Sequence, residues 1–98
     1  MVRHIILWKI KEGLSKEDVA RDIKINLEKL PLTVPGILKL KVLTESLPSS
    51  SCDVMLDSAF ENVEALAAYR VHPDHVRVAD TYVRPMCDVR LCFDFEEK

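Results

Sequence analysis

The sequence is poor in glycine and aromatic residues, and it has no excess of charge of either sign. Gly13 and Gly36 are its two glycines, so it has no glycine-rich loop of the kind that cradles phosphate. Its 14 basic residues are interspersed with 16 acidic ones, for a net charge of −2. Because no basic stripe or interleaving of basic and aromatic residues is present, we expect no nucleic-acid partner.

Long apolar runs are absent as well. No stretch comes near the ~20 apolar residues that span a bilayer. The short apolar run at residues 5–8 is followed by Lys9 and Lys11, which is not the pattern of a signal peptide. We therefore expect a cytoplasmic protein with no membrane partner.

The three cysteines are an odd number and show no CxxC spacing, which argues against a disulfide framework or a zinc site. Cys87 and Cys92 are an odd number of positions apart, so on one strand we expect them to face opposite sides. We expect the cysteines to be free, buried thiols. A nucleophilic cysteine would require His4 or His75 beside it.

The 98 residues predict one domain, residues 1–98, because the chain is too short for two cores. The pattern predicts an α+β protein of the ferredoxin-like βαββαβ type, with one four-stranded antiparallel sheet. A proline should break its second helix at His72-Pro73. The expected elements are strands at 2–10, 37–46, 52–60 and 86–95, helices at 16–30 and 62–70, and a short helix from Pro73 that ends before Pro85.

The first strand is apolar on both faces, with His4, Ile6 and Trp8 on one side and Ile5 and Leu7 on the other. Helices can cover one face of so small a sheet. The other face also receives Leu43, Met55 and parts of 86–95, and it is too apolar to face water. We therefore predict a homodimer formed through this sheet face. On the helix side of the second strand we expect Leu38, Leu40 and Val42.

Two histidines and a tyrosine gather around the predicted helix break, in the stretch from Tyr69 to Val76. If the chain turns at Pro73, His75 returns beside Tyr69, and His4 can face both from the first strand. An apolar cleft with a few convergent polar groups is typical of a small-molecule site. The residues predicted to contact a small apolar substrate are Ile6, Trp8, Ile23, Leu27, Val54, Leu56, His72 and Val78.

These residue types suggest acid/base chemistry that requires no cofactor. His75 would be the general base and remove a proton next to a carbonyl. Tyr69 would hydrogen-bond the enolate oxygen or hold His75 in its productive tautomer. His4 would orient the substrate.

Each residue also has a structural alternative. His72 before a proline is commonly a cap or turn residue, Tyr69 could be a core aromatic, and His4 could reach a carboxylate. A metal site built from His72, His75, His4 and Asp80 would lack the i,i+4 spacing of a helical zinc pair, and we expect no metal.

Four segments carry a resemblance to a known family: Val2-Arg3-His4-Ile5, Pro35-Gly36-Ile37, Tyr69-x-x-His72-Pro73-x-His75-Val76 and Cys92-Phe93-Asp94-Phe95. Together they resemble the stress-responsive A/B barrel (Dabb) domain along essentially the whole chain. The resemblance implies a ferredoxin-like monomer that pairs into a dimeric α+β barrel.

In the polyketide cyclases of that family, a tyrosine and a histidine that match Tyr69 and His75 form the acid/base pair, and one matching His4 lies in the pocket. A third-strand histidine of the cyclases is replaced here by Val54. The resemblance implies a cyclase- or isomerase-like enzyme for a small carbonyl-bearing aromatic or polyketide-like compound. The alternatives are a non-catalytic stress-related scaffold or ligand-binding protein and, third, a small cofactorless monooxygenase.

Overall fold

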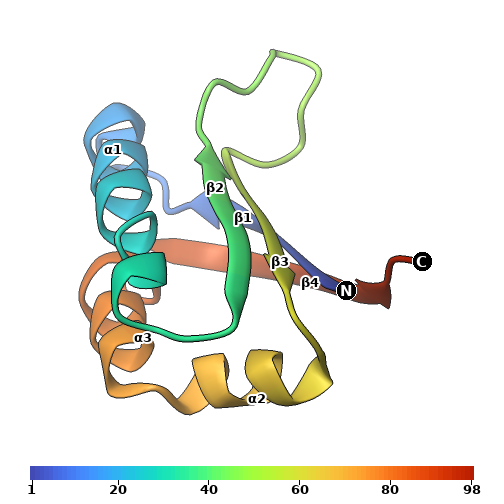
Figure 1. Cartoon of the computed structure of the whole chain (residues 1–98). Helices are drawn as coiled ribbons and strands as arrows, with labels where there is room; N and C mark the ends of the chain where they lie inside the picture. The colour runs from blue at the N-terminus through green and yellow to red at the C-terminus, as the bar shows by residue number, and fades with distance from the viewer.

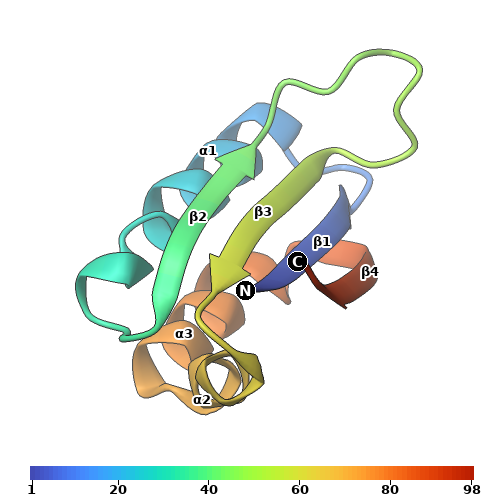
Figure 2. The ribbon, with the colours of Figure 1, turned by 45° about the vertical axis from the view of Figure 1, so that its right-hand side comes forward.

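A four-stranded antiparallel sheet with the strand order β2-β3-β1-β4 forms one layer of the structure, a computed structural model that describes residues 1–98. The helices gather on one face of this sheet (Figures 1 and 2). This is the ferredoxin-like α+β plan, and it confirms the predicted fold class. The elements are β1 (Val2–Ile10), α1 (Lys16–Leu27), η1 (Leu30–Leu32), β2 (Ile37–Leu43), β3 (Val54–Phe60), α2 (Val63–Val71), α3 (Pro73–Val78), η2 (Ala79–Val83) and β4 (Cys87–Glu96).

The helix boundaries follow from side-chain caps and prolines. The Ser15 side chain accepts a hydrogen bond from the Asp18 N–H, and Asn62 accepts one from Ala65 in the same way. α1 ends at Leu27 instead of residue 30, because Pro31 has no N–H to donate back to Leu27 and its ring would clash there. None of the helices combines the length and the apolar character that crossing a membrane requires.

The core lies between the sheet and the helix layer. As predicted for β1, His4, Ile6 and Trp8 are buried under the helices, while Ile5 and Leu7 on the opposite face are only partly covered. Apolar side chains of α1, β3 and α2 close the core against them, chiefly Ile23, Leu27, Val54, Leu56, Phe60 and Leu66.

A bulge in β2 changes which of its leucines are buried. Ile37 pairs with Phe60 and Lys39 with the adjacent Ala59, so Leu38 is an extra residue in the ladder. The predicted position of Leu38 on the helix side was therefore wrong, and 54% of its surface is exposed.

A second irregularity lies where β1 meets β4. Ile10 pairs with Cys87 while its neighbour Lys9 pairs with Val89, so Asp88 is the additional residue. The extra residue shifts the alternation of β4, and Cys87 and Cys92 both face the helix side, opposite Ile10 and Ile6. Their predicted placement on opposite faces was therefore wrong, because the alternation rule assumes an unbulged strand.

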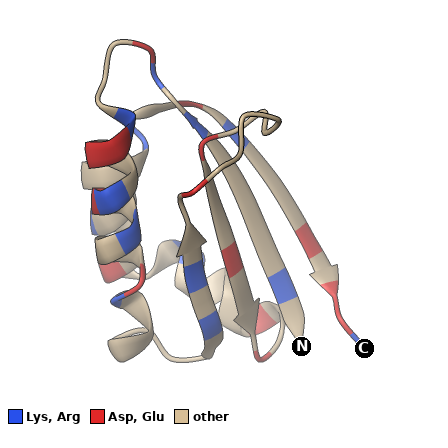
Figure 3. Cartoon of the chain, turned by 90° about the horizontal axis from the view of Figure 1, so that it is seen from above, with Lys and Arg blue, Asp and Glu red and all other residues tan.

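The sheet face away from the helices carries apolar residues on all four strands. Figure 3 marks the positions at which Lys, Arg, Asp and Glu interrupt these strands. Leu91 and Phe93 of β4 lie opposite Leu7 and Ile5 of β1, and they are 55% and 68% exposed. Met55 and Leu43 extend this surface across β3 and β2. The open sheet face thus has the apolar character that the sequence predicted for it.

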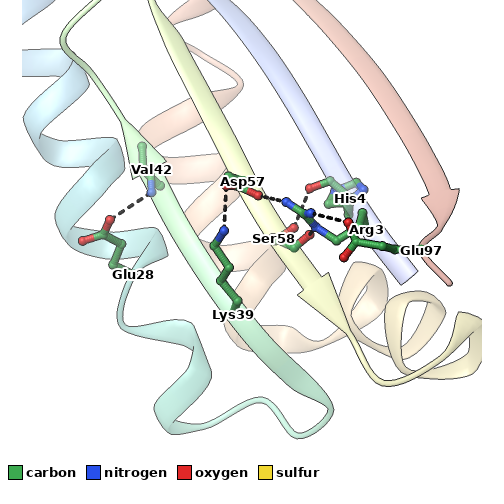
Figure 4. A network of polar contacts seen from close by, with 8 residues as sticks. All are labelled: Arg3, His4, Glu28, Lys39, Val42, Asp57, Ser58 and Glu97. Atoms are coloured by element: carbon green, nitrogen blue, oxygen red, sulfur yellow. Dashed lines mark hydrogen bonds and ion pairs between the residues drawn. The ribbon is translucent and has the colours of Figure 1, made fainter. Parts of the chain in front are cut away.

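A chain of ion pairs crosses one end of the open face (Figure 4). Asp57 accepts from Lys39 Nζ at 2.8 Å and also binds the guanidinium of Arg3, which contacts Glu97 at 3.2 Å. The hydrogen bond from Lys39 and that from Arg3 lower the pKa of Asp57, although its partial burial opposes the shift. This network joins β2, β3 and β1 on the side that no helix covers.

Gly36 lies between η1 and β2 with a φ of +87°, and an added Cβ would lie 2.7 Å from the Cβ of Ala65 in α2. Gly13 has the same φ, but an added Cβ there would meet nothing. We expect Gly13→Ala to cost about 1–2 kcal/mol of stability from backbone strain alone. Gly36→Ala should cost clearly more, because α2 must also shift.

Urea denaturation of the two variants and the wild type measures this difference. Equal losses of stability in the two variants would contradict the close packing of Gly36 against α2.

Candidate active site at the helix break

The break between α2 and α3 is made by Pro73, the first residue of α3. In a continuous helix the N–H of Asp74 would bond to the carbonyl of Arg70. Here Asp74 N–H donates instead to Nδ1 of His72 at 3.1 Å, and His72 has extended backbone angles. His72 is therefore the N-cap of α3, the structural alternative that the sequence left open.

Because Asp74 N–H does not donate to the Arg70 carbonyl, that oxygen is available, and the ring of His75 donates a hydrogen bond to it instead. His75 Nδ1 lies 3.2 Å from that oxygen. A carbonyl oxygen can only accept, so Nδ1 carries the proton and the neutral ring keeps a lone pair on Nε2. Burial lowers the pKa of His75 and outweighs the opposing effect of the hydrogen bond to the Arg70 carbonyl, and the nearby charges of Arg84 and Arg90 lower the pKa further. The ring is therefore neutral at physiological pH, with an available base at Nε2.

Tyr69 packs directly against this ring. The two ring centroids are 4.2 Å apart with the planes tilted by 38°, and the ring centroid of Phe60 lies 4.9 Å from that of Tyr69. The Tyr69 hydroxyl has no hydrogen-bond partner in the protein. Because every fully buried polar side-chain atom has such a partner, this hydroxyl is not fully buried, and it borders the cavity. Burial raises the pKa of Tyr69, so this group is a phenol that donates.

His4 belongs to a separate polar chain at the edge of the sheet. Its Nδ1 lies 2.5 Å from Oδ1 of Asp94, and the other oxygen of Asp94 lies 2.5 Å from Nη2 of Arg70. The Ser58 hydroxyl also donates to the His4 carbonyl at 2.6 Å (Figure 4). Burial lowers the pKa of His4 and outweighs the opposing effect of Asp94. His4 thus donates from Nδ1 to Asp94 and leaves Nε2 unprotonated. The contact with a carboxylate is the structural alternative that the sequence analysis gave for His4.

A cavity of about 210 Å³ brings the three residues together. This volume exceeds the ~150 Å³ known to accommodate benzene and is below the ~300–1,000 Å³ of drug-sized sites. A molecule with one ring or a short chain fits it. The cavity is lined by His4, Ile6, Trp8, Leu27, Leu56, Tyr69, His75, Ala79, Val83, Arg84, Cys87 and Arg90.

Seven of the eleven residues predicted for the site line this cavity. The other four are Ile23, Val54 and Val78, which belong to the core behind it, and His72, which caps α3. The sequence offered no means to separate core from cavity, because both are apolar at the same periodicity.

Five lining residues were not predicted, and local irregularities place four of them there. Ala79 and Val83 belong to η2, a π-helical turn closed by the bond from Arg84 N–H to Ala79 O at 2.8 Å. Turns of this kind are rare and occur often at functional sites. Cys87 faces the cavity because of the irregularity at Asp88, whereas Arg90 lies in the regular part of β4, opposite Trp8, and faces the helix side in any case.

Cys92 meets the distance condition for a nucleophilic cysteine but not the chemical one. Cys92 Sγ lies 3.9 Å from His4 Nδ1, yet that nitrogen carries the proton shared with Asp94. Burial and the neighbouring Asp94 raise the pKa of Cys92, and burial raises the pKa of Cys87 to about 11. Both are thiols at neutral pH, so neither is an activated nucleophile.

Donor atoms of His4, Cys92 and Asp94 lie within 4.8 Å of one another, the spacing of a metal site. Their chemistry does not fit one, because Asp94 already binds His4 and Arg70. The guanidinium of Arg70 would also repel a cation. The metal set considered from the sequence is not assembled, since Asp80 pairs with Arg84.

The fold and this cavity define a ferredoxin-like α+β protein with a histidine–tyrosine pocket between its helices and its edge strand. The profile of the Stress Responsive A/B Barrel Domain matches residues 2–97. The chain belongs to this family, as the sequence motifs predicted.

Individual relatives show the same relationship. The chain is 31% identical over 97 residues to a stress-response A/B barrel domain-containing protein of Arabidopsis thaliana, covering 97% of this chain but 36% of that longer protein. It is 26% identical over 96 residues to olivetolic acid cyclase of Cannabis sativa, covering 96% and 94%. A crystal structure of a dimeric, ferredoxin-like protein of unknown function from Bacteroides fragilis superposes with a TM-score of 0.90 and 28% identity, covering 98% and 95%.

The buried imidazole of His4 and the half-buried imidazole of His75 predict a loss of stability in mild acid. Burial lowers the pKa of His4 and His75 below the ordinary 6.5, so the unfolded chain takes up protons at a higher pH than the folded chain. Stability should be fully retained above pH 6.5 and fall below it, by at most about 1.4 kcal/mol per pH unit for each histidine. Urea denaturation at several pH values measures this slope, and His75→Gln should make it shallower. A stability that rises on acidification would contradict the neutral state of both rings.

Proposed function

We propose that this chain is a cofactorless acid/base enzyme for a small carbonyl-bearing compound, cyclase- or isomerase-like in its chemistry. The observation that supports this most directly is the hydrogen bond from His75 to the Arg70 carbonyl. It leaves Nε2 of His75 unprotonated in the same cavity as the unpartnered Tyr69 hydroxyl. A base and a hydrogen-bond donor in a mostly apolar cavity are the two groups that enolisation needs.

In the first step, Nε2 of His75 takes a proton from the carbon next to the substrate carbonyl. The Tyr69 hydroxyl donates a hydrogen bond to the carbonyl oxygen, on which the negative charge develops. Return of the proton to a different carbon gives an isomerase. In a cyclase, the enolate carbon attacks a second carbonyl carbon of the same molecule, and the new alkoxide takes the proton from the His75 imidazolium.

His4 is proposed to orient the substrate through its free Nε2. The bond to Asp94 holds the ring, and Arg70 holds Asp94, so the orientation of His4 is set from both the sheet and α2. The relative named as a cyclase covers nearly the whole chain and supports an aromatic or polyketide-like substrate.

The alternative is a stress-related scaffold or ligand-binding protein without catalysis, which the similarity to the Arabidopsis stress-response protein supports. It predicts that the cavity binds small molecules without accelerating proton transfer, so the following measurement separates the two functions.

Deuterium exchange into 1-phenyl-1,3-butanedione, followed by NMR in D₂O, tests the proposed base. The wild type should accelerate exchange of the protons between the carbonyls over buffer alone. His75→Gln should lower the rate by about a hundredfold or more, and Tyr69→Phe by a similar factor.

His72→Asn is the matched control. It removes an imidazole one turn from His75 but keeps an N-cap residue, so it should retain the wild-type rate. Exchange at the buffer rate with the wild type, or an unchanged rate in His75→Gln, would contradict the enzymatic function.

We also infer that the protein is a homodimer joined through the open sheet face. The exposed Leu91 and Phe93 lie on this face, on its edge strand β4, and an exposed apolar area of this kind normally marks an interface. The Bacteroides fragilis relative, described as dimeric, supports the same assembly.

The double substitution Leu91→Lys with Phe93→Lys should give monomers, because it would bury four charges at a two-fold interface. Light scattering after size-exclusion chromatography measures the mass. Leu32→Lys, at an 84% exposed position in η1 on the helix side, is the control and should remain dimeric. A wild type of monomer mass would contradict the assembly.

A further inference from the structure

The mouth of the cavity carries more positive charge than its acidic groups balance. A second hollow adjoins the cavity, shares five residues with it, and is lined by His4, Tyr69, Arg70, His75, Arg84 and Arg90. No carboxylate lines either hollow. The opening therefore presents three guanidinium groups and two imidazoles around an otherwise apolar interior.

The three arginines differ in their partners. Arg70 binds Asp94 and Arg84 binds Asp80, each at 2.5 Å, whereas the Arg90 guanidinium has no acidic partner. The pair of Arg84 and Asp80 is largely exposed to solvent, so Arg84 can exchange its partner at little cost. Arg90 and Arg84 are therefore the guanidinium groups available to a ligand.

Two different elements set the positions of these arginines relative to the rings of His4, Tyr69 and His75. Arg84 follows η2 directly, and Arg90 lies on β4 opposite Trp8. The charge of Arg90 lowers the pKa of His4, Tyr69 and His75 alike, which places it within electrostatic reach of all three. A negatively charged ligand group beside Arg90 would offset the effect of its positive charge on these three pKa values.

We propose that Arg90 and Arg84 form an anion subsite at the cavity mouth, so that the ligand is a small apolar molecule carrying a carboxylate. A guanidinium presents a planar fork that matches a carboxylate with two parallel hydrogen bonds. The apolar part of the ligand then enters between Trp8, Leu27 and Leu56, and its reactive carbonyl lies near Tyr69. This assignment specifies the substrate class of the proposed enzyme and rests on that function, but the subsite is tested by binding alone.

The test uses matched acid and amide probes. Benzoate, phenylacetate and 3-phenylpropanoate are titrated into ¹³C- and ¹⁵N-labelled protein beside benzamide, phenylacetamide and 3-phenylpropanamide, and the ring signals of Tyr69 and His75 report occupancy. The best acid should bind about 10- to 100-fold more tightly than its own amide. Phenyl phosphate distinguishes a carboxylate from a phosphate site, and its tighter binding would overturn the carboxylate assignment.

Variants of the arginines complete the test. Arg90→Gln should lower the affinity for the acid nearly to that for its amide and leave the affinity for the amide unchanged. Arg90→Lys should retain part of the tighter binding of the acid. Arg77→Gln is the control, because Arg77 is an exposed arginine of α3 outside both hollows, and it should bind like the wild type.

The outcomes separate the subsite from the enzyme. Equal affinities of acids and amides, or no binding of any probe, overturn the anion subsite while the exchange reaction can still proceed. Acid binding that depends on Arg90, together with exchange at the buffer rate, supports the subsite and contradicts the enzymatic function.

Discussion

Pro73 has no N–H, and α2 cannot continue through it, so the last carbonyls of that helix must find other donors. The N–H of His72 donates to the carbonyl of Tyr69, and the ring of His75 donates to that of Arg70. His72 in turn supplies the acceptor for Asp74 N–H. The need to satisfy these backbone groups therefore sets the tautomer of His75 and directs its Nε2 away from the helix.

Arg70 connects this break to the sheet. Its carbonyl accepts a hydrogen bond from the ring of His75, and its guanidinium donates one to Asp94. Asp94 in turn accepts a hydrogen bond from His4 on β1. One residue of α2 thus orients both imidazoles that border the cavity, one through its backbone and one through its side chain. Since α2 and β4 are far apart in sequence, the ion pair between Arg70 and Asp94 also ties the edge strand to the helix layer.

The sequence predicted the fold and part of the site for different reasons. Alternation in β1 and the break at Pro73 are local signals, and both predictions were confirmed. The placements of Leu38 and of Cys87 relative to Cys92 failed because one extra residue in a strand reverses the alternation beyond it. Arg84 was missed because the π-helical turn before it has no clear sequence signature, while Arg90 lies in the regular part of β4 and was not considered.

The central claim is that the neutral His75 ring carries its proton on Nδ1 and offers Nε2 as a base. The ¹⁵N chemical shifts of the ring, recorded at about pH 7 with two-bond couplings to the ring protons, identify the tautomer directly. We expect a neutral ring with a protonated Nδ1 and an unprotonated Nε2. A proton on Nε2, or a doubly protonated ring at that pH, would contradict the account.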